Sequence, residues 1–303
     1  MTPRLTRGTA AIGAAAIALA LAACGSDDAS GGDTDNGGAS GTITLGFIPS
    51  WTDGLSTAYL LEDQLTKLGY EVEMEELQEP GVLYAGLANG DFDMYPSAWP
   101  EVTHADYMKE FGDDIEDIGT YYENAKLTMA VPSYVDVSSI EDLKGHAGDF
   151  GGRVVGIEAG AGLTKATKEK VFPEYGLSED GYELLTSSTP AMLAELKKAT
   201  EAKQDIVVTL WRPFWANSAF DMKDLEDPKG ALGKSEALHF LGATGFAEKF
   251  PEAAEMIKGI KLSDEDYGSM EKAVNDAPEG EREAAIDTWL DEHPDAFPTM
   301  VKE

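Results

Sequence analysis

The length, composition and charge of the chain exclude several classes of function. Its 303 residues are enough for one large or two moderate domains, with a core that needs no disulfide or metal to hold it together. The 56 acidic residues outnumber the 23 Lys and Arg, which gives a formal net charge of −33. This excess argues against nucleic acids and anionic lipid surfaces as partners, because both require a basic face, and it is compatible with a cationic ligand.

The first 23 residues have the features of an export signal. Two arginines precede an apolar run over 9–23, which is too short for a comfortable transmembrane helix and is followed by Cys24. The sequence Leu-Ala-Ala-Cys resembles the bacterial lipobox, in which the cysteine carries lipid and becomes the new N-terminus. We therefore expect a signal peptide over 1–23, a lipidated Cys24 and a flexible tether of Gly, Ser and Asp over 24–41.

From Thr42 onward the hydrophobic pattern predicts alternating strands and helices. The first strands are indicated over 42–48, 70–77 and 91–96, and the first helices over 55–69 and 82–91. The order β-α-β-α-β predicts a mostly parallel sheet with helices on its faces.

A second α/β unit is predicted after an apolar strand at 125–135. Its strands are indicated over 153–158, 182–186 and 205–211, and its helices over 138–145, 160–172 and 190–203. Beyond the sequence RPFW the chain is expected to be helical again, over 251–260, 265–276 and 281–294.

Three of the five tryptophans stand at the end of a predicted strand or just after one. These are Trp51, Trp99 and Trp211. Because ligands of open α/β sheets bind beyond the carboxyl ends of the strands, we expect the three rings to converge. Trp289 lies on an apolar helix stripe and is expected in the core. Whether Trp215, close to Trp211, forms a further wall of the aromatic site stays open.

A group of tryptophans favours a ligand with a permanent positive charge. A quaternary ammonium has no N–H to donate, so aromatic faces recognise it, each contributing about 0.5–2 kcal/mol as the site becomes dry. Asp53, two residues after Trp51, fits either the negative end of such a cage or the N-cap of the helix that follows. Both readings stay open.

The turn in GIEAGAGL predicts a place for an anion. Gly160 and Gly162 frame a strand-to-helix turn whose backbone amides, near Gly162 and Leu163, favour a negative group. A plain glycine turn is the alternative, and phosphate is disfavoured because the chain has neither GxGxxG nor Gly-Lys-Ser/Thr here. His104, five residues after Trp99, can close a carboxylate site if it reaches the same crevice.

These motifs resemble a known family. The stretches PSWTDG, YAGLANGDFDMYPSAWPEVTH, GIEAGAGL and DIVVTLWRPFW are similar to the glycine betaine/choline-binding proteins of ABC importers, over nearly all of 42–303. The resemblance implies a two-lobed, periplasmic-binding-protein-like (type II) α/β fold, each lobe a mixed, mostly parallel sheet flanked by helices, with the ligand cleft between them. We expect lobe 1 to comprise 42–129 and 212–303, and lobe 2 to comprise 130–211.

The resemblance also implies roles for individual residues. The aromatic cage falls on Trp51, Trp99 and Trp211, and the ligand carboxylate falls on His104, Gly162 and Leu163. Further candidates are Asp53, Gly160, Ala161 and Trp215.

Two positions bear on the choice of ligand. Choline-binding relatives lack the histidine, and they carry Tyr at the position of Leu127 and Asn at that of Ala161, so this chain favours a betaine. Phe214 stands where many members have His, which leaves room for a betaine other than glycine betaine.

The implied function is that of an extracytoplasmic, lipid-anchored monomer that captures glycine betaine or a related betaine and delivers it to an ABC permease for osmoprotection. A choline or carnitine binder and a ligand-binding sensor are the alternatives. The four histidines are scattered, without HExxH or GxSxG, so we expect no catalytic activity, no cofactor and no metal.

Overall fold

The computed structural model describes residues 40–302, so the predicted signal peptide, Cys24 and most of the predicted tether lie outside the described part. Within 40–302, no helix is both long and apolar enough to cross a membrane. The strands are β1 (Thr42–Phe47), β2 (Glu71–Glu76), β3 (Met94–Ala98), β4 (Ile115–Pro132), β5 (Arg153–Val155), β6 (Glu183–Leu185), β7 (Val207–Arg212), β8 (Met222–Asp224) and β9 (Glu236–Ala243). The helices are α1 (Thr52–Leu68), α2 (Pro80–Asn89), α3 (Ala105–Phe111), α4 (Gly162–Ala166), α5 (Phe172–Tyr175), α6 (Thr189–Ala202), α7 (Ala216–Ala219), α8 (Phe246–Lys249), α9 (Pro251–Lys258), α10 (Asp264–Asp276) and α11 (Arg282–Glu292).

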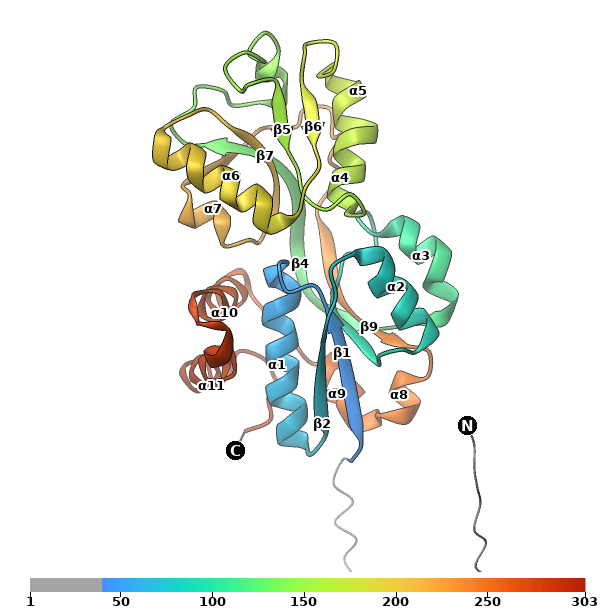
Figure 1. The fold of residues 1–303 in the computed structure, drawn as a ribbon. Coiled ribbons are helices and arrows are strands. Elements are labelled where there is room, and N and C mark those ends of the chain that lie inside the picture. Colours follow the sequence, from blue (N-terminus) through green and yellow to red (C-terminus); the bar gives the residue numbers. More distant parts are fainter. Residues whose placement is uncertain (1–39, 303) are drawn as a thin grey trace, which may run out of the picture. The chain divides into compact units, whose positions relative to one another are not determined.

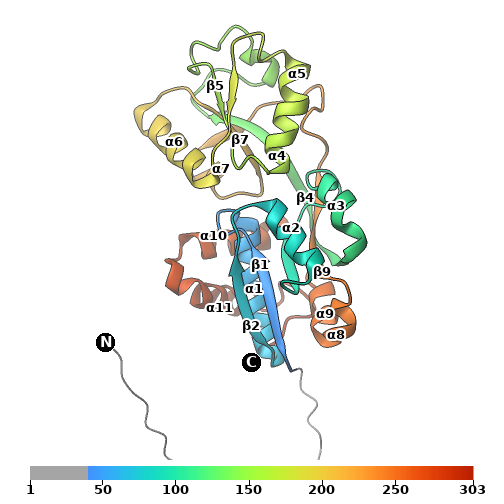
Figure 2. The ribbon, with the colours of Figure 1, turned by 45° about the vertical axis from the view of Figure 1, so that its right-hand side comes forward.

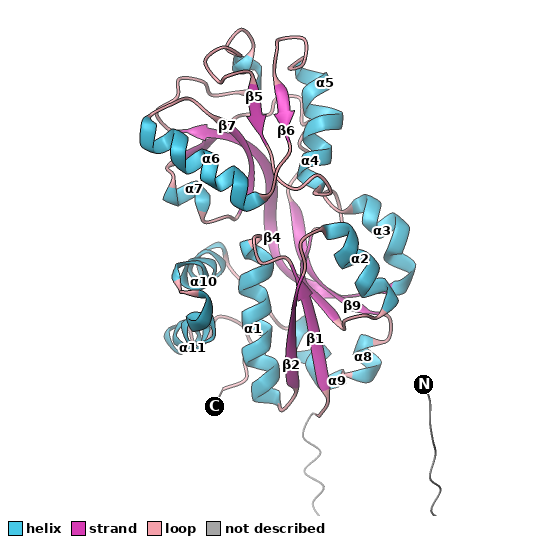
Figure 3. Cartoon of the chain, viewed as in Figure 1, coloured by secondary structure: helices cyan, strands magenta, loops and turns pink. Residues whose placement is uncertain are grey.

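The strands follow the order β2-β1-β3-β9-β4-β7-β5-β6, with β8 also pairing with β4. β1 is parallel to β2 and β3, and β5 is parallel to β6 and β7. β4 and β9 lie antiparallel to their neighbours and join the two parallel groups (Figure 3). The nine strands therefore form one continuous mixed sheet whose two parallel groups are each flanked by helices (Figure 3).

β4 is long enough to belong to both groups of strands. Its residues 115–125 pair with β9, residues 126–130 pair with β7, and residues 130–132 pair with β8. Figures 1 and 2 show β5, β6 and β7 with helices α4 to α7 in one group, and β1 and β2 with α1 and α8 to α11 in the other. β4 is thus one connection between the groups.

The pairing of β8 bears on where the second connection between the groups lies. Because β8 pairs with β4 beside β7, the chain stays with the second group beyond residue 212. We therefore propose that lobe 2 comprises 126–224, that 225–235 is the return, and that lobe 1 holds the remainder of the described chain.

The helices expected beyond RPFW are confirmed as α9, α10 and α11, but two strands that the sequence did not predict, β8 and β9, precede them. β9 lies between β3 and β4 and is buried along nearly all of its length. A strand covered on both faces lacks the alternation of apolar and polar residues that marks a half-buried strand, and β9 (EALHFLGA) also contains Glu236 and His239, so periodicity does not identify it.

The start of helix α1 places Trp51 and Asp53 beyond the carboxyl end of β1. It begins directly after Trp51, which is its N-cap residue, and ends at Gly69, whose φ of 107° lies in the left-handed region that glycine tolerates. The buried face of α1 packs against β3 and so fixes the N-terminal turn at the carboxyl edge of the sheet.

Close packing of α2 on the sheet predicts a glycine requirement at Gly46. A Cβ there would lie 2.5 Å from the ring of Phe92, which also fills the space beside Gly86. Gly46→Ala is expected to lower the free energy of unfolding by about 1–3 kcal/mol in urea titrations, because the buried ring has to shift. The matched control is Gly268→Ala, in an exposed turn of α10 with open space, which should be neutral or stabilising by up to about 1 kcal/mol. Equal effects at both positions would contradict the packing argument.

Candidate ligand-binding site

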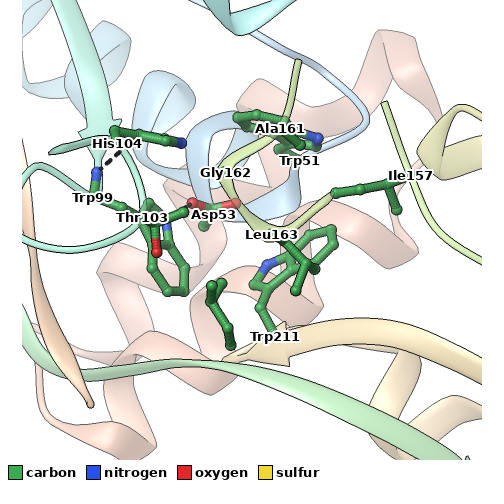
Figure 4. A pocket seen from close by; sticks show the side chains of 11 residues that line it. Trp51, Asp53, Trp99, Thr103, His104, Ile157, Ala161, Gly162, Leu163 and Trp211 are labelled. Atoms are coloured by element: carbon green, nitrogen blue, oxygen red, sulfur yellow. Dashed lines mark hydrogen bonds between the residues drawn. The ribbon is translucent and has the colours of Figure 1, made fainter. Parts of the chain in front are cut away.

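One pocket gathers most of the residues that the sequence singled out (Figure 4). They come from the carboxyl ends of β1, β3 and β7, from β4, and from the turn before α4. The pocket encloses about 330 Å³ including its mouth, at the small end of the range for small-molecule sites. Its lining residues are Trp51, Asp53, Trp99, Thr103, His104, Leu127, Ile157, Ala161, Gly162, Leu163 and Trp211.

Two of the three cage tryptophans are fixed through their indole N–H groups. Trp51 Nε1 donates to Glu158 Oε2 at 3.2 Å, and Trp99 Nε1 donates to Asp53 Oδ2 at 3.0 Å. Both rings are more than nine-tenths buried. A carboxylate on the indole N–H sets the orientation of the ring and polarises it, which makes the face more negative and more attractive to a cation.

Trp211 is held differently. The ring of Phe214 stacks on it with a centroid distance of 3.9 Å and an interplanar angle of 22°, and Leu127 of β4 is its partner in the sheet register. Its buried Nε1 has no hydrogen-bond partner within residues 40–302. Phe214 does not line the pocket, so this departure from the family pattern lies behind the cage wall and not at the pocket surface.

Asp53 faces the pocket and does not cap helix α1. The helix begins at Thr52 with Trp51 as its N-cap residue, so the capping alternative is wrong. The Asp53 carboxylate is buried and also accepts a hydrogen bond of 2.8 Å from Ser97 Oγ. Burial raises its pKa, and the bonds from Trp99 and Ser97 partly offset this. None of the salt bridges within 40–302 involves Asp53, so the protein supplies this carboxylate with hydrogen-bond donors and with no cation.

His104 is a neutral donor with a defined tautomer. The backbone N–H of Trp99, which can only donate, points at Nδ1 at 3.3 Å, and the Tyr84 hydroxyl lies 3.0 Å from the same atom. Nδ1 is therefore the acceptor and Nε2 carries the proton. Burial lowers the pKa of His104 to about 3, so the ring is uncharged at neutral pH. Figure 4 shows its free nitrogen pointing into the pocket.

The glycine-rich turn supplies backbone donors from the opposite side. α4 begins at Gly162, so the amides of Gly162 and Leu163 have no acceptor within the helix. A Cβ on Gly162 would lie 2.0 Å from the carbonyl oxygen of Thr103, a contact that only glycine permits. The turn and the loop after β3 are therefore pressed together at the pocket.

Two further candidates are not brought into the pocket. Gly160 faces away, and its carbonyl accepts a hydrogen bond of 2.8 Å from the Tyr107 hydroxyl. Trp215 packs between Phe214 and Phe220 and does not line the pocket. Trp289 lies in the core, as predicted, and donates to Ser269 Oγ.

Sequence reasoning missed two buried carboxylates around the cage. Glu158 accepts the indole N–H of Trp51, and its signal was an acid inside the otherwise small or apolar stretch GIEAGAGL. Glu271 of α10 accepts from the Thr52 hydroxyl and from the backbone of Trp215. Nothing in the pattern of α10 marks Glu271, because its contacts come from helices that are distant in the sequence. Within the described residues no group of His, Cys, Asp and Glu is arranged to hold a metal ion.

Comparisons with known proteins give a consistent result. A family model described as the substrate binding domain of ABC-type glycine betaine transport system matches residues 41–292. The structure of the glycine betaine, L-proline ABC transporter binding protein ProX from Borrelia burgdorferi is 30% identical, with a TM-score of 0.77, over 86% of this chain and 97% of that one. Lactococcal OpuAC, closed and complexed with glycine betaine, is 28% identical, with a TM-score of 0.76, over 84% of this chain and 96% of that one.

A curated relative covers less of the chain. The glycine betaine/carnitine transport binding protein GbuC of Listeria monocytogenes is 37% identical over 142 residues. This alignment spans 47% of this chain and 46%, about half, of GbuC.

The chain belongs to the family of substrate-binding domains of ABC-type glycine betaine transport systems. The predicted two-lobed, type II binding-protein fold is confirmed by the structures that it resembles. Members of this family are transport binding proteins and not enzymes.

The buried position of Glu271 predicts a pH-dependent cost to stability. Burial raises its pKa to about 8, against 4.5 for an ordinary glutamate. Below pH 4.5 Glu271 is protonated in both the folded and the unfolded protein, and its contribution to the free energy of unfolding is fully present. As the pH rises from 4.5 through 8 this contribution is lost, by at most about 1.4 kcal/mol per pH unit, because the unfolded state releases the proton first. Glu271→Gln keeps an acceptor for Thr52 and removes the charge.

The difference in free energy of unfolding between Glu271→Gln and the wild type should therefore grow in favour of the variant from pH 5 to pH 8, in urea titrations. Exposed Glu265→Gln, on the same helix, is the control and should show no such trend. A constant difference for Glu271→Gln across this range would contradict the assignment.

Proposed function

We propose that the protein captures glycine betaine, or a closely related betaine, and delivers it to the permease of an ABC importer. The observation that supports this most directly is the convergence of three indole rings in one pocket, opposite a neutral histidine donor and two free backbone amides. A trimethylammonium group fits the three indole rings, and a carboxylate fits the histidine donor and the two backbone amides.

The cage accounts for the cationic end of the ligand. The rings of Trp51, Trp99 and Trp211 each contribute about 0.5–2 kcal/mol of cation–π attraction, more as the site becomes dry. Asp53 supplies a buried negative charge that the cation of the ligand balances. Glycine betaine has few heavy atoms, and a ceiling of about 1.5 kcal/mol per atom still leaves room for micromolar binding.

The carboxylate end joins the two lobes. His104 lies after β3 in proposed lobe 1, whereas Gly162 and Leu163 lie before α4 in proposed lobe 2. A ligand held by both sides favours the closed arrangement, because its full set of contacts exists only there.

A betaine is favoured over choline by what the pocket lacks. Leu127 and Ala161 both line it, at the two positions where the resemblance places Tyr and Asn in choline binders. Neither side chain can donate to a hydroxyl or complete the cage. Choline and carnitine remain the alternative ligands, and a sensor of the same ligand is the alternative role.

We further propose that the protein works outside the cytoplasm as a lipid-anchored monomer. The resemblance of the N-terminal sequence to a lipobox supports lipidation of Cys24, and a single cysteine leaves no internal disulfide to form. A second acyl chain would make that anchoring stable.

His104→Ala should separate recognition of the acid from recognition of the cation. We expect calorimetric titration to show glycine betaine binding weakened by about tenfold or more, because a donor to a charged group is lost, and choline binding changed little. His146→Ala, on the exposed surface of lobe 2, is the control and should bind both ligands normally. Equal losses for glycine betaine and choline would contradict the carboxylate role.

Gly162→Ala should prevent the lobes from closing on the ligand. The added Cβ meets the Thr103 carbonyl at 2.0 Å, so we expect glycine betaine affinity to fall by about a hundredfold with little change in thermal stability. Gly148→Ala, in open space on lobe 2, provides the comparison and should leave affinity unchanged. Normal binding by Gly162→Ala would show that the close contact is not needed.

A further inference from the structure

Glu158 lies at the junction between the cage and the second lobe. It follows β5, in the same turn that presents the amides of Gly162 and Leu163. Its side chain is buried, and its Oε2 accepts the indole N–H of Trp51, which belongs to the loop between β1 and α1. This hydrogen bond joins positions 107 residues apart in the sequence.

The carboxylate is held on the side of lobe 2 by Thr189. Oε1 accepts the backbone N–H of Thr189 at 2.8 Å, and Oε2 accepts its hydroxyl at 2.9 Å. Thr189 is the first residue of α6, a helix of 14 residues, so Glu158 sits at a helix N-terminus that favours a negative charge. Three donors and a helix dipole therefore stabilise this buried carboxylate, and none of the ion pairs within 40–302 includes it.

Other contacts cross between the lobes near the same turn, but they lie at the rim. The Tyr107 hydroxyl donates to the Gly160 carbonyl, and Lys165 pairs with Asp106. Tyr107 is partly exposed, and both charged side chains of the ion pair are exposed. Glu158 differs because it is buried and because its lobe 1 partner is a ring of the cage itself.

We propose that Glu158 is a positioning residue that makes lobe closure and completion of the aromatic cage a single event. This inference rests on the proposed function. When the lobes are apart, Trp51 loses the carboxylate that orients it. When they meet, the turn that brings Glu158 to Trp51 also brings the amides of Gly162 and Leu163 to the acid end of the ligand.

Glu158→Gln is the variant best suited to test this. In the wild type, three donors (the Trp51 indole N–H, the Thr189 N–H and the Thr189 hydroxyl) face the two carboxylate oxygens of Glu158. A glutamine amide has only one oxygen, so its NH₂ group must face at least one of these donors. The Thr189 hydroxyl can rotate to become an acceptor, whereas the Trp51 N–H cannot, so the favoured amide orientation keeps the Thr189 contacts and loses the bond to Trp51. Shape and packing are retained.

The experiment is a double-mutant cycle on glycine betaine binding by the mature protein, using Glu158→Gln, Trp51→Phe and the double variant. Phe at 51 keeps an aromatic face and has no N–H. We expect Glu158→Gln to weaken binding by about tenfold or more in the wild-type background and by less than about twofold in the Trp51→Phe background. The control is Glu201→Gln, exposed on α6, which should bind as the wild type does.

The outcomes separate this proposal from the proposed function. A wild-type protein that binds no betaine overturns the proposed function before any variant is compared. A wild type that binds, together with a Glu158→Gln variant that weakens binding equally in both backgrounds or not at all, overturns the positioning role alone. If Glu158→Gln does not fold, Thr189→Val provides the second route: loss of one anchoring bond should weaken binding about threefold in the wild-type background and not in Trp51→Phe.

Discussion

The site depends on the hydrogen bond between the edge of an indole ring and a buried carboxylate. Asp53 accepts Trp99, and Glu158 accepts Trp51, at 3.0 and 3.2 Å. A tryptophan face has no directional group of its own, so its orientation must be set from its edge. The same bonds place negative charge beside a pocket that residues 40–302 line without any cationic side chain, and a quaternary ammonium is a ligand that can supply the missing positive charge.

The fold provides this arrangement by bringing strand ends and a helix start to one place. Trp51 and Trp99 follow parallel strands of one group, whereas Trp211 ends a strand of the other, and β4 pairs with strands of both. The glycine-rich turn reaches the loop after β3 so closely that Gly162 has no room for a side chain. His104 carries its proton on Nε2, and its lowered pKa keeps the ring neutral, so its charge does not depend on pH near neutrality.

Much of this could be predicted from the sequence, and the reasons for the misses are physical. The rings of Trp51, Trp99 and Trp211 were found because parallel strands direct their carboxyl ends to one edge, a rule that needs only the order of elements. β9 was missed because a strand buried on both faces has no alternation, and β8 was missed because three residues are too few to form a pattern. Glu158 and Glu271 were missed because the value of a buried carboxylate lies in its partners, which are 107 and 219 residues away and leave no local pattern.

The central claim is that the pocket recognises a positive charge and not merely a shape. The most direct measurement compares the affinity of the protein for glycine betaine and for 3,3-dimethylbutanoate, in which carbon replaces the quaternary nitrogen with the same size and the same carboxylate. Cation–π attraction from three rings predicts that the carbon analogue binds about a hundredfold more weakly or worse, measured by calorimetric titration under one set of conditions. Comparable affinities for the two compounds would contradict the account.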